Sequence, residues 1–262
     1  MRVVAALILA PLTIGVVFAG GWLWILLVTF VAVGLFYEWH AIVNPKREPK
    51  SFAVGIITLE LIGLSLWLGW NGIAFAAAII GPSIIALLSS EQRWWNVTGL
   101  IYALAALIAS VIVRLDGTTG FYALVFTLLV VWVTDIGGYF AGRAIGGPKL
   151  APRISPKKTW AGAIGGLVLS IAIAFAAAAI GWGRIMPLLT LAIALSIISQ
   201  LGDLFESWVK RRFGVKDSSQ IIPGHGGLLD RLDGFVAAIV FAAILGFSRG
   251  GLDGVGRGFM IW

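Results

Sequence analysis

The feature that most constrains this chain is a series of long apolar segments that recurs from one end of the sequence to the other. Each is close to the roughly 20 residues that an α-helix needs to cross a bilayer. Apolar residues make up 60% of the 262 and charged residues only 12%, a composition that a soluble domain of this size does not need. The sequence therefore predicts an all-α, polytopic integral membrane protein of about nine transmembrane helices. We place these spans at about 3–19, 21–40, 52–70, 72–89, 96–113, 119–142, 160–181, 185–207 and 227–248.

We expect a single membrane domain over residues 1–262, made of three parts. Residues 1–51 would form an N-terminal helical hairpin and a basic loop. The first two spans are short and joined by Gly20–Gly21, so they form a tight hairpin or lie tilted in the bilayer. Residues 52–142 would form the middle helices. Residues 143–262 would hold basic loops and the helices that carry most of the site. The first span follows Met1–Arg2 directly and is expected to remain in the protein rather than to be cleaved as a signal peptide.

The distribution of Lys and Arg predicts the orientation in the membrane. With the N-terminus inside, the loops that face the cytoplasm hold most of the basic residues, and the richest are 143–159 and 208–226. The loops on the other side hold only Arg114, Arg184, Arg249 and Arg257. This bias predicts the N-terminus inside and the C-terminus outside. The net charge of +7 is then explained by anionic lipid, and no nucleic-acid partner is expected.

One stretch, Gly202–Gly234, combines acidic and basic residues beside apolar spans, where ionisable groups are costly. The chain has no cysteine and only two histidines, His40 and His225, so thiolate sites are excluded and a His-rich zinc site is disfavoured. Carboxylates interleaved with Lys and Arg instead indicate a divalent metal together with phosphate. The ionisable residues of the stretch are Asp203, Glu206, Lys210, Arg211, Arg212, Lys216, Asp217, His225, Asp230, Arg231 and Asp233.

Two of these carboxylates are the best candidates for metal ligands. Asp203 lies near the cytoplasmic end of its span and shares a helix face with Glu206 and Lys210, although that face is equally consistent with simple exposure to water at the membrane surface. Asp230 and Asp233 lie one turn apart where the last span begins, and complementing the helix dipole explains one of them better than both. Mg²⁺ prefers one or two carboxylates with water and phosphate oxygens, which Asp203 and Asp230 on adjacent helices would provide.

Two further segments are suited to phosphate. Glycines in the turn 223–227 allow the backbone to approach a phosphate, and the helix that follows offers free N–H groups, although an ordinary interhelical turn is the alternative. Lys157 and Lys158 precede another span and are suited to phosphate, although they would also serve as a positively charged membrane anchor. Asp135 lies deep in span 119–142, where it must pair with a basic residue or face a polar cavity.

The segments Ser207–Arg211, Lys216–Asp217 and Pro223–Asp233 together resemble the signature of the phosphatidate cytidylyltransferase, or CDP-diacylglycerol synthase, family. The segments Asp135–Tyr139, Ser155–Thr159 and Tyr37–Trp39 resemble the same family, so the likeness covers most of the chain. One departure is Trp160-Ala161-Gly162, where an acidic residue is expected before the glycine.

This resemblance implies that CTP and phosphatidic acid give CDP-diacylglycerol and pyrophosphate. It also implies Mg²⁺, a second cation (K⁺ or another Mg²⁺), a homodimer, and a site that faces the cytoplasm from a prokaryotic inner membrane. It places Asp203 and Asp230 as metal ligands. We add Asp135 and Asp233 as weaker candidates, which would support the metal shell or orient Arg231. The predicted catalytic residues are Asp203, Lys210, His225, Asp230 and Arg231. The predicted substrate-binding residues are Ser155, Lys157, Lys158, Arg211, Lys216, Asp217, Gly226 and Gly227.

Two other classes of function remain open at this point. A CTP-dependent transferase acting on another lipid phosphate or on a polyprenol would need the same charged groups. An ion-coupled transporter would use intramembrane acids such as Asp135 and Glu60, but the charge lies mainly at one face and no inverted repeat is apparent.

Overall fold

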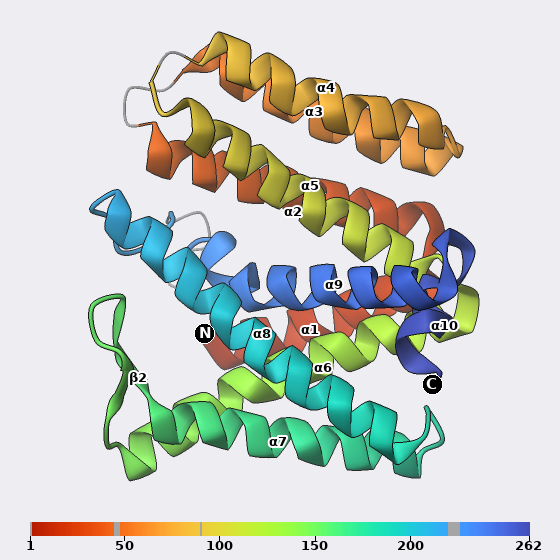
Figure 1. Cartoon of the computed structure of the whole chain (residues 1–262), viewed down its shortest axis with the longest axis vertical. Coiled ribbons are helices and arrows are strands. Elements are labelled where there is room, and N and C mark those ends of the chain that lie inside the picture. The colour runs from red at the N-terminus through yellow and green to blue at the C-terminus, as the bar shows by residue number, and fades with distance from the viewer. Residues whose placement is uncertain (1, 45–47, 90, 220–225) are drawn as a thin grey trace. The chain divides into compact units, whose positions relative to one another are not determined.

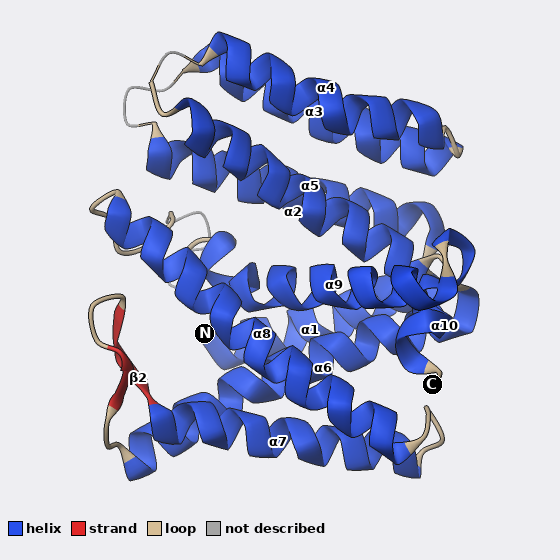
Figure 2. Cartoon of the chain, in the orientation of Figure 1, coloured by secondary structure: helices blue, strands red, loops and turns tan. Residues whose placement is uncertain are grey.

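The computed structural model describes residues 2–44, 48–89, 91–219 and 226–262 and is helical almost throughout (Figures 1 and 2). Among these residues, 8 helices are long and apolar enough to cross a membrane. The all-α membrane fold predicted from the sequence is therefore confirmed. The 8 helices are α2 (Gly21–Val43), α3 (Pro49–Leu68), α4 (Asn71–Leu88), α5 (Arg93–Arg114), α6 (Gly117–Ile145), α7 (Trp160–Ala179), α8 (Ile185–Arg212) and α9 (Leu229–Gly250).

The first predicted span corresponds to α1 (Arg2–Ala19), a helix of 18 residues; the total of nine spans stays a prediction. The chain divides into two compact units. The first unit comprises Met1–Val111 and Phe213–Arg231, and the second comprises Ile112–Arg212 and Leu232–Trp262. The expectation of a single membrane domain with three parts stays a prediction.

In the first unit, two tryptophans fasten α2 along α5. The indole N–H of Trp24 donates to the carbonyl of Ser110 at 3.0 Å, and that of Trp39 donates to the carbonyl of Trp95 at 2.9 Å. A buried tryptophan needs such an acceptor for its N–H. Gly99 faces the Trp39 ring so closely that an added Cβ would lie 2.2 Å from Cδ1. These contacts fix the last turns of α2, which carry Glu38.

In the second unit, glycines bring α6 and α7 into backbone contact. A Cβ added at Gly137 would lie 2.7 Å from the carbonyl oxygen of Gly165, and one added at Gly166 would lie 2.6 Å from that of Thr134. The hydroxyl of Thr134 also bonds to Ser170 on α7 at 2.8 Å and to Ser196 on α8 at 3.1 Å. Small residues and shared hydroxyls are how helices associate where no water competes. The three helices form the frame of the site described below.

A short antiparallel hairpin joins α6 to α7, formed by β1 (Lys149–Ala151) and β2 (Ser155–Thr159) with Lys149 opposite Thr159 (Figure 2). The sequence predicted a basic loop here and not a strand. Five residues that include a proline do not distinguish a strand from a loop, so the hairpin was not predicted. The side chain of Thr159 accepts a hydrogen bond from the N–H of Gly162 at 3.1 Å and so caps α7. Because successive strand residues point to opposite faces, Lys157 and Lys158 are directed apart.

The C-terminal residues return to the beginning of α6. After α9, a 3₁₀ turn (η1, Leu252–Gly254) leads into the short helix α10 (Val255–Met260), which packs against α6. The backbone N–H of Arg257 donates to Asp116 Oδ2 at 2.7 Å, and the backbones of Gly256 and Gly120 lie close together. This end of the second unit is opposite the hairpin (Figure 1).

Candidate active site

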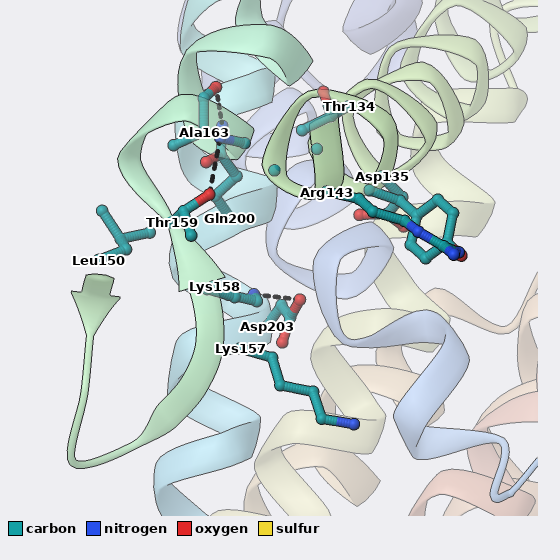
Figure 3. A pocket seen from close by; sticks show the side chains of 14 residues that line it. Thr134, Asp135, Arg143, Leu150, Lys157, Lys158, Thr159, Ala163, Gln200 and Asp203 are labelled. Carbon is teal, nitrogen blue, oxygen red and sulfur yellow. Dashed lines mark hydrogen bonds and ion pairs between the residues drawn. The ribbon is translucent and has the colours of Figure 1, made fainter. Parts of the chain in front are cut away.

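A cavity of about 450 Å³ lies in the second unit between α6, α7, α8 and the hairpin (Figure 3). Its volume is within the roughly 300–1,000 Å³ that is typical of small-molecule sites. Asp135 lines this cavity and is exposed, which agrees with the polar-cavity interpretation of that residue. The lining residues are Thr134, Asp135, Gly138, Tyr139, Gly142, Arg143, Leu150, Lys157, Lys158, Thr159, Gly162, Ala163, Gln200 and Asp203.

An ion pair between the Lys158 ammonium and Asp203 Oδ2 crosses this cavity from β2 to α8 (Figure 3). The two side chains are 26% and 29% exposed, so the pair is accessible from the cavity. Lys157, on the other face of the strand, extends away from the pair. Of the two lysines predicted to bind phosphate, Lys158 is therefore the one held by an acid.

Asp203 belongs to a group of acidic side chains where α8 meets α9. An added Cβ at Gly202 would lie 2.6 Å from the Cβ of Ala237 and 2.7 Å from the carbonyl oxygen of Asp233, so only glycine permits this approach of the two helices. Asp233 is thereby close enough to interact electrostatically with Asp203, Glu206 and Asp135. Clustered carboxylates repel one another unless cations lie among them, so this group is suited to cationic partners.

Glu206 and Lys210 form an ion pair one helical turn apart, with 2.6 Å between Oε2 and Nζ. The side chains are 1% and 11% exposed, so simple exposure to water is wrong for Glu206 and Lys210. The spacing of four residues was a signal in the sequence for this pair. The catalytic role predicted for Lys210 stays a prediction, and the structure adds a stabilising role through Glu206.

Basic side chains gather at the hairpin end of the second unit. Arg211, at the end of α8, donates from Nε to the carbonyl of Ile154 in the hairpin at 3.4 Å. Arg143, at the end of α6, donates to the Tyr139 hydroxyl at 2.9 Å beside the cavity. Arg211, from the second basic loop, therefore contacts the first basic loop. Arg143 has no predicted role from the sequence, because a lone arginine after an apolar span is also an ordinary membrane anchor.

In the first unit, Asp230 stands in the first turn of α9 and is held through one oxygen. Its Oδ2 accepts hydrogen bonds from the N–H and hydroxyl of Ser218 at 3.0 and 2.9 Å and from the N–H of Gly227 at 3.0 Å. A Cβ at Gly227 would lie 1.8 Å from Ser218 Oγ, and Gly226 has a φ of 82°. The two glycines thus let the turn close around Asp230, and the Gly227 N–H serves this carboxylate.

The other predicted residues are distributed over both units. Lys216 and Asp217 are exposed after α8, Arg231 is exposed in the first turn of α9, and Ser155 begins β2 opposite Ala151. His225 lies outside the described residues. Sequence reasoning missed Glu38, a buried residue of α2 whose carboxylate contacts Ser218. One acid inside an apolar helix does not reveal its partner, so the sequence carried no signal for this contact beyond the family-like Tyr37–Trp39 segment.

The predicted metal requires carboxylates that can bind it together with phosphate. Among the described residues, no group of three or more His, Cys, Asp or Glu side chains is arranged to hold a metal ion. Mg²⁺ does not need such a cage, because it usually keeps several waters and is bound by one or two carboxylates plus substrate phosphates. Asp203 in the second unit and Asp230 in the first each offer one carboxylate, and Asp203 already accommodates an ammonium. Each of these carboxylates, taken by itself, is therefore of the kind that Mg²⁺ binds together with phosphate and water oxygens.

The fold and the cavity define a polytopic membrane protein with acidic and basic side chains around a cavity between its helices. Residues 1–248 match the cytidylyltransferase family, and the chain belongs to this family, as the resemblance predicted. It is a CTP-dependent nucleotidyltransferase.

Bacterial proteins named phosphatidate cytidylyltransferase are similar along most of the chain. That of Brucella suis biovar 1 (strain 1330) is 40% identical over 252 residues, covering 94% of this chain and 92% of its own length. That of Pseudomonas aeruginosa is 35% identical over 262 residues, covering 93% of this chain and 96% of its own length. That of Haemophilus influenzae is 35% identical over 247 residues, covering 80% and 85%.

Proposed function

We propose that this protein transfers CMP from CTP to phosphatidic acid, giving CDP-diacylglycerol and pyrophosphate for phospholipid synthesis. Its membership of the cytidylyltransferase family and the names of its relatives support this reaction. The structural observation that carries the proposal is the Lys158–Asp203 ion pair in a cavity between membrane-spanning helices. Such a site offers positive charge for phosphates and a carboxylate for a cation.

The reaction requires charge compensation more than proton transfer. A phosphate oxygen of the lipid attacks the α-phosphorus of CTP, and the bond from that phosphorus to the β-phosphate oxygen breaks as pyrophosphate leaves. The lipid phosphate is already anionic at neutral pH, so no strong base is needed. The obstacle is the approach of two anions, which fixed Lys and Arg charges offset in the transition state.

In our proposal, residues of both units contact the phosphates of the substrates. In the second unit, Lys158, Lys157 and Arg211 bind the triphosphate or the lipid headgroup, with Ser155 beside them. In the first unit, the residues after α8 and around the turn before α9 contact the CTP phosphates. These residues are Lys216, Asp217, His225, Gly226, Gly227 and Arg231. Asp203 orients the Lys158 ammonium, and the donors on Asp230 Oδ2 orient that carboxylate.

Asp203 and Asp230 would hold Mg²⁺, with Asp135 and Asp233 as weaker candidates, and a second cation (K⁺ or another Mg²⁺) is part of the proposal. When bound, the metal neutralises phosphate charge and polarises the P–O bonds. We also propose a homodimer in the bacterial inner membrane, with the N-terminus inside, the C-terminus outside and the site open to the cytoplasm. The basic residues at the hairpin end of the second unit support this orientation.

Substrate competition tests the proposed reaction. Purified protein with Mg²⁺ and α-labelled CTP should label phosphatidic acid, and an excess of a polyprenyl phosphate or an ether-linked isoprenoid phosphate should not reduce this labelling. Preferential labelling of either competitor would show that this competitor, and not phosphatidic acid, is the substrate. Transport of an ion or solute by reconstituted protein, without any CTP turnover, would reject the enzyme.

A further inference from the structure

Glu38 is a fully buried acid near the end of α2, at 0% exposure. A carboxylate buried in an apolar helix is costly unless hydrogen bonds compensate it. Four donors contact it within the first unit, and all come from residues that flank the turn before α9. Oε1 accepts from the Ser219 hydroxyl at 2.6 Å and the Leu228 N–H at 2.8 Å, while Oε2 accepts from the Ser218 hydroxyl at 2.8 Å and the Leu229 N–H at 2.7 Å.

Two of these donors are the backbone N–H groups where α9 begins. The first N–H groups of a helix have no partner inside the helix and are usually capped by a side chain just before it. Here the cap comes from a helix 190 residues earlier in the chain. Negative charge is also favourable at a helix N-terminus. Glu38 therefore caps these N–H groups. It also fixes the position of the first residues of α9 against α2.

The same donors connect Glu38 to Asp230. The Ser218 hydroxyl lies 2.8 Å from Glu38 Oε2 and 2.9 Å from Asp230 Oδ2. A serine hydroxyl has one proton, so the two carboxylates share it. A Cβ at Gly227 would lie 2.5 Å from Glu38 Oε2, and one at Gly34, a turn before Glu38, would lie 2.7 Å from Leu228 Cδ2. The face of α2 that carries Gly34 and Glu38 thus packs against Gly227 and Leu228, just before Asp230.

We propose that Glu38 is a positioning residue, which fixes the Asp230 carboxylate through Ser218 and the first turn of α9. This rests on the proposed function, in which Asp230 takes part in binding Mg²⁺ and CTP phosphates. Glu38 itself touches no substrate. Its effect is on the orientation of Asp230, so its loss lowers the rate of CMP transfer and the response to Mg²⁺ more than it changes the affinity for phosphatidic acid.

Glu38→Gln is the sharpest test, because it keeps the shape and replaces one acceptor oxygen by an NH₂ group that cannot accept from a backbone N–H. Partners that orient a metal ligand are typically worth about 10–100-fold in activity or metal affinity. We expect kcat to fall by about that factor and the Mg²⁺ concentration for half-maximal rate to rise, with the KM for phosphatidic acid unchanged. Amide hydrogen exchange over residues 226–232 should become faster, which reports the lost contacts without any turnover.

Thr29→Val is the matched control, since Thr29 is a buried polar residue of the same helix, and among the described residues its hydroxyl bonds only within that helix, to the carbonyl of Ile25. It should leave kcat, the Mg²⁺ response and the exchange of residues 226–232 as in wild type. Ser219→Ala removes a single donor from Oε1 and serves if Glu38→Gln does not fold. It should give the same changes on a smaller scale.

Wild-type kcat together with wild-type exchange in Glu38→Gln would overturn the inference, and so would faster exchange with unchanged kcat and Mg²⁺ response. An equal loss of rate in Thr29→Val would show that Glu38 only stabilises the fold and does not position Asp230. If wild-type protein does not turn over phosphatidic acid, the proposed function fails by itself. The exchange measurement then still decides whether Glu38 holds the beginning of α9.

Discussion

Lys158 on β2 and Asp203 on α8 form an ion pair across the cavity of the second unit. The lysine comes from the basic segment before α7, and the aspartate is the first ionisable residue of the Gly202–Gly234 stretch. The structure therefore joins two segments that the sequence marked separately. Both side chains are about a quarter exposed, at 26% and 29%, so the pair is accessible from the cavity.

Replacing either member of this pair should lower activity, and the two losses should not multiply. We expect Lys158→Met and Asp203→Asn each to reduce kcat/KM by about 10²-fold, because each removes fixed charge near the reacting phosphates. The double variant should be much less impaired than the product of the single losses, since residues in contact are energetically coupled. Steady-state kinetics of the four proteins measures the coupling. Strictly multiplicative losses would show that the ion pair has no role in catalysis.

Lys210→Met should destabilise the protein, because it leaves the buried Glu206 carboxylate without its ammonium. Removing one partner of a buried pair typically costs about 3–5 kcal/mol. The double variant Glu206→Gln, Lys210→Met should recover most of this free energy of unfolding, and Arg212→Met, at an exposed position of the same helix end, should change it little. Unfolding in detergent measures all three. Wild-type stability in Lys210→Met would contradict the structural role, whereas a stable but inactive double variant would support the phosphate role of Lys210.

Gly166→Ala should separate α6 from α7. The new methyl group would lie 2.6 Å from the carbonyl oxygen of Thr134, and overpacking of this kind typically costs about 1–3 kcal/mol. Gly72→Ala is the control, because Gly72 lies in helix α4 with nothing within 4 Å of an added Cβ. It should leave stability unchanged or raise it by up to about 1 kcal/mol. Equal melting temperatures for the two variants would contradict the close packing of α6 on α7.

The two ends of α7 should lie on opposite sides of the membrane. The chain has no cysteine, so Arg153→Cys in the hairpin and Arg184→Cys before α8 each introduce a single thiol at an exposed position. A membrane-impermeant maleimide should label Arg153→Cys only from the cytoplasm and Arg184→Cys only from outside, with the unmodified chain as the blank. The reverse labelling pattern would show that the protein has the opposite orientation in the membrane.

Most of the fold was predictable because each helix is an apolar run of spanning length. The helix ends were less predictable. The span predicted to end at 207 continues as α8 to Arg212, and the one predicted to end at 142 continues as α6 to Ile145. Both extensions carry basic residues, which are good helix formers and favourable at a helix C-terminus. The hydrophobicity of the sequence indicates where a helix can leave the bilayer, but not the residue at which the helix ends.

The chemistry of the site was predictable in type but not in pairing. The Gly202–Gly234 stretch indicated carboxylates with basic residues, yet nothing local connects Asp203 to Lys158, because their contact depends on how the hairpin packs on α8. The same holds for Glu38, whose donors lie far along the chain. Only the Glu206–Lys210 pair has a helical spacing that indicates such a contact, and there the prediction extended only to a shared helix face.

The central claim is tested most directly by conversion of phosphatidic acid to CDP-diacylglycerol by purified protein with CTP and Mg²⁺, beside folded Asp203→Asn and Asp230→Asn. We predict turnover by the wild type, with release of pyrophosphate, and loss of most activity in both variants. Wild-type turnover in both variants would show that the protein is an enzyme whose active site is not the proposed one. Absence of CTP-dependent turnover in the folded wild type would contradict the proposed function.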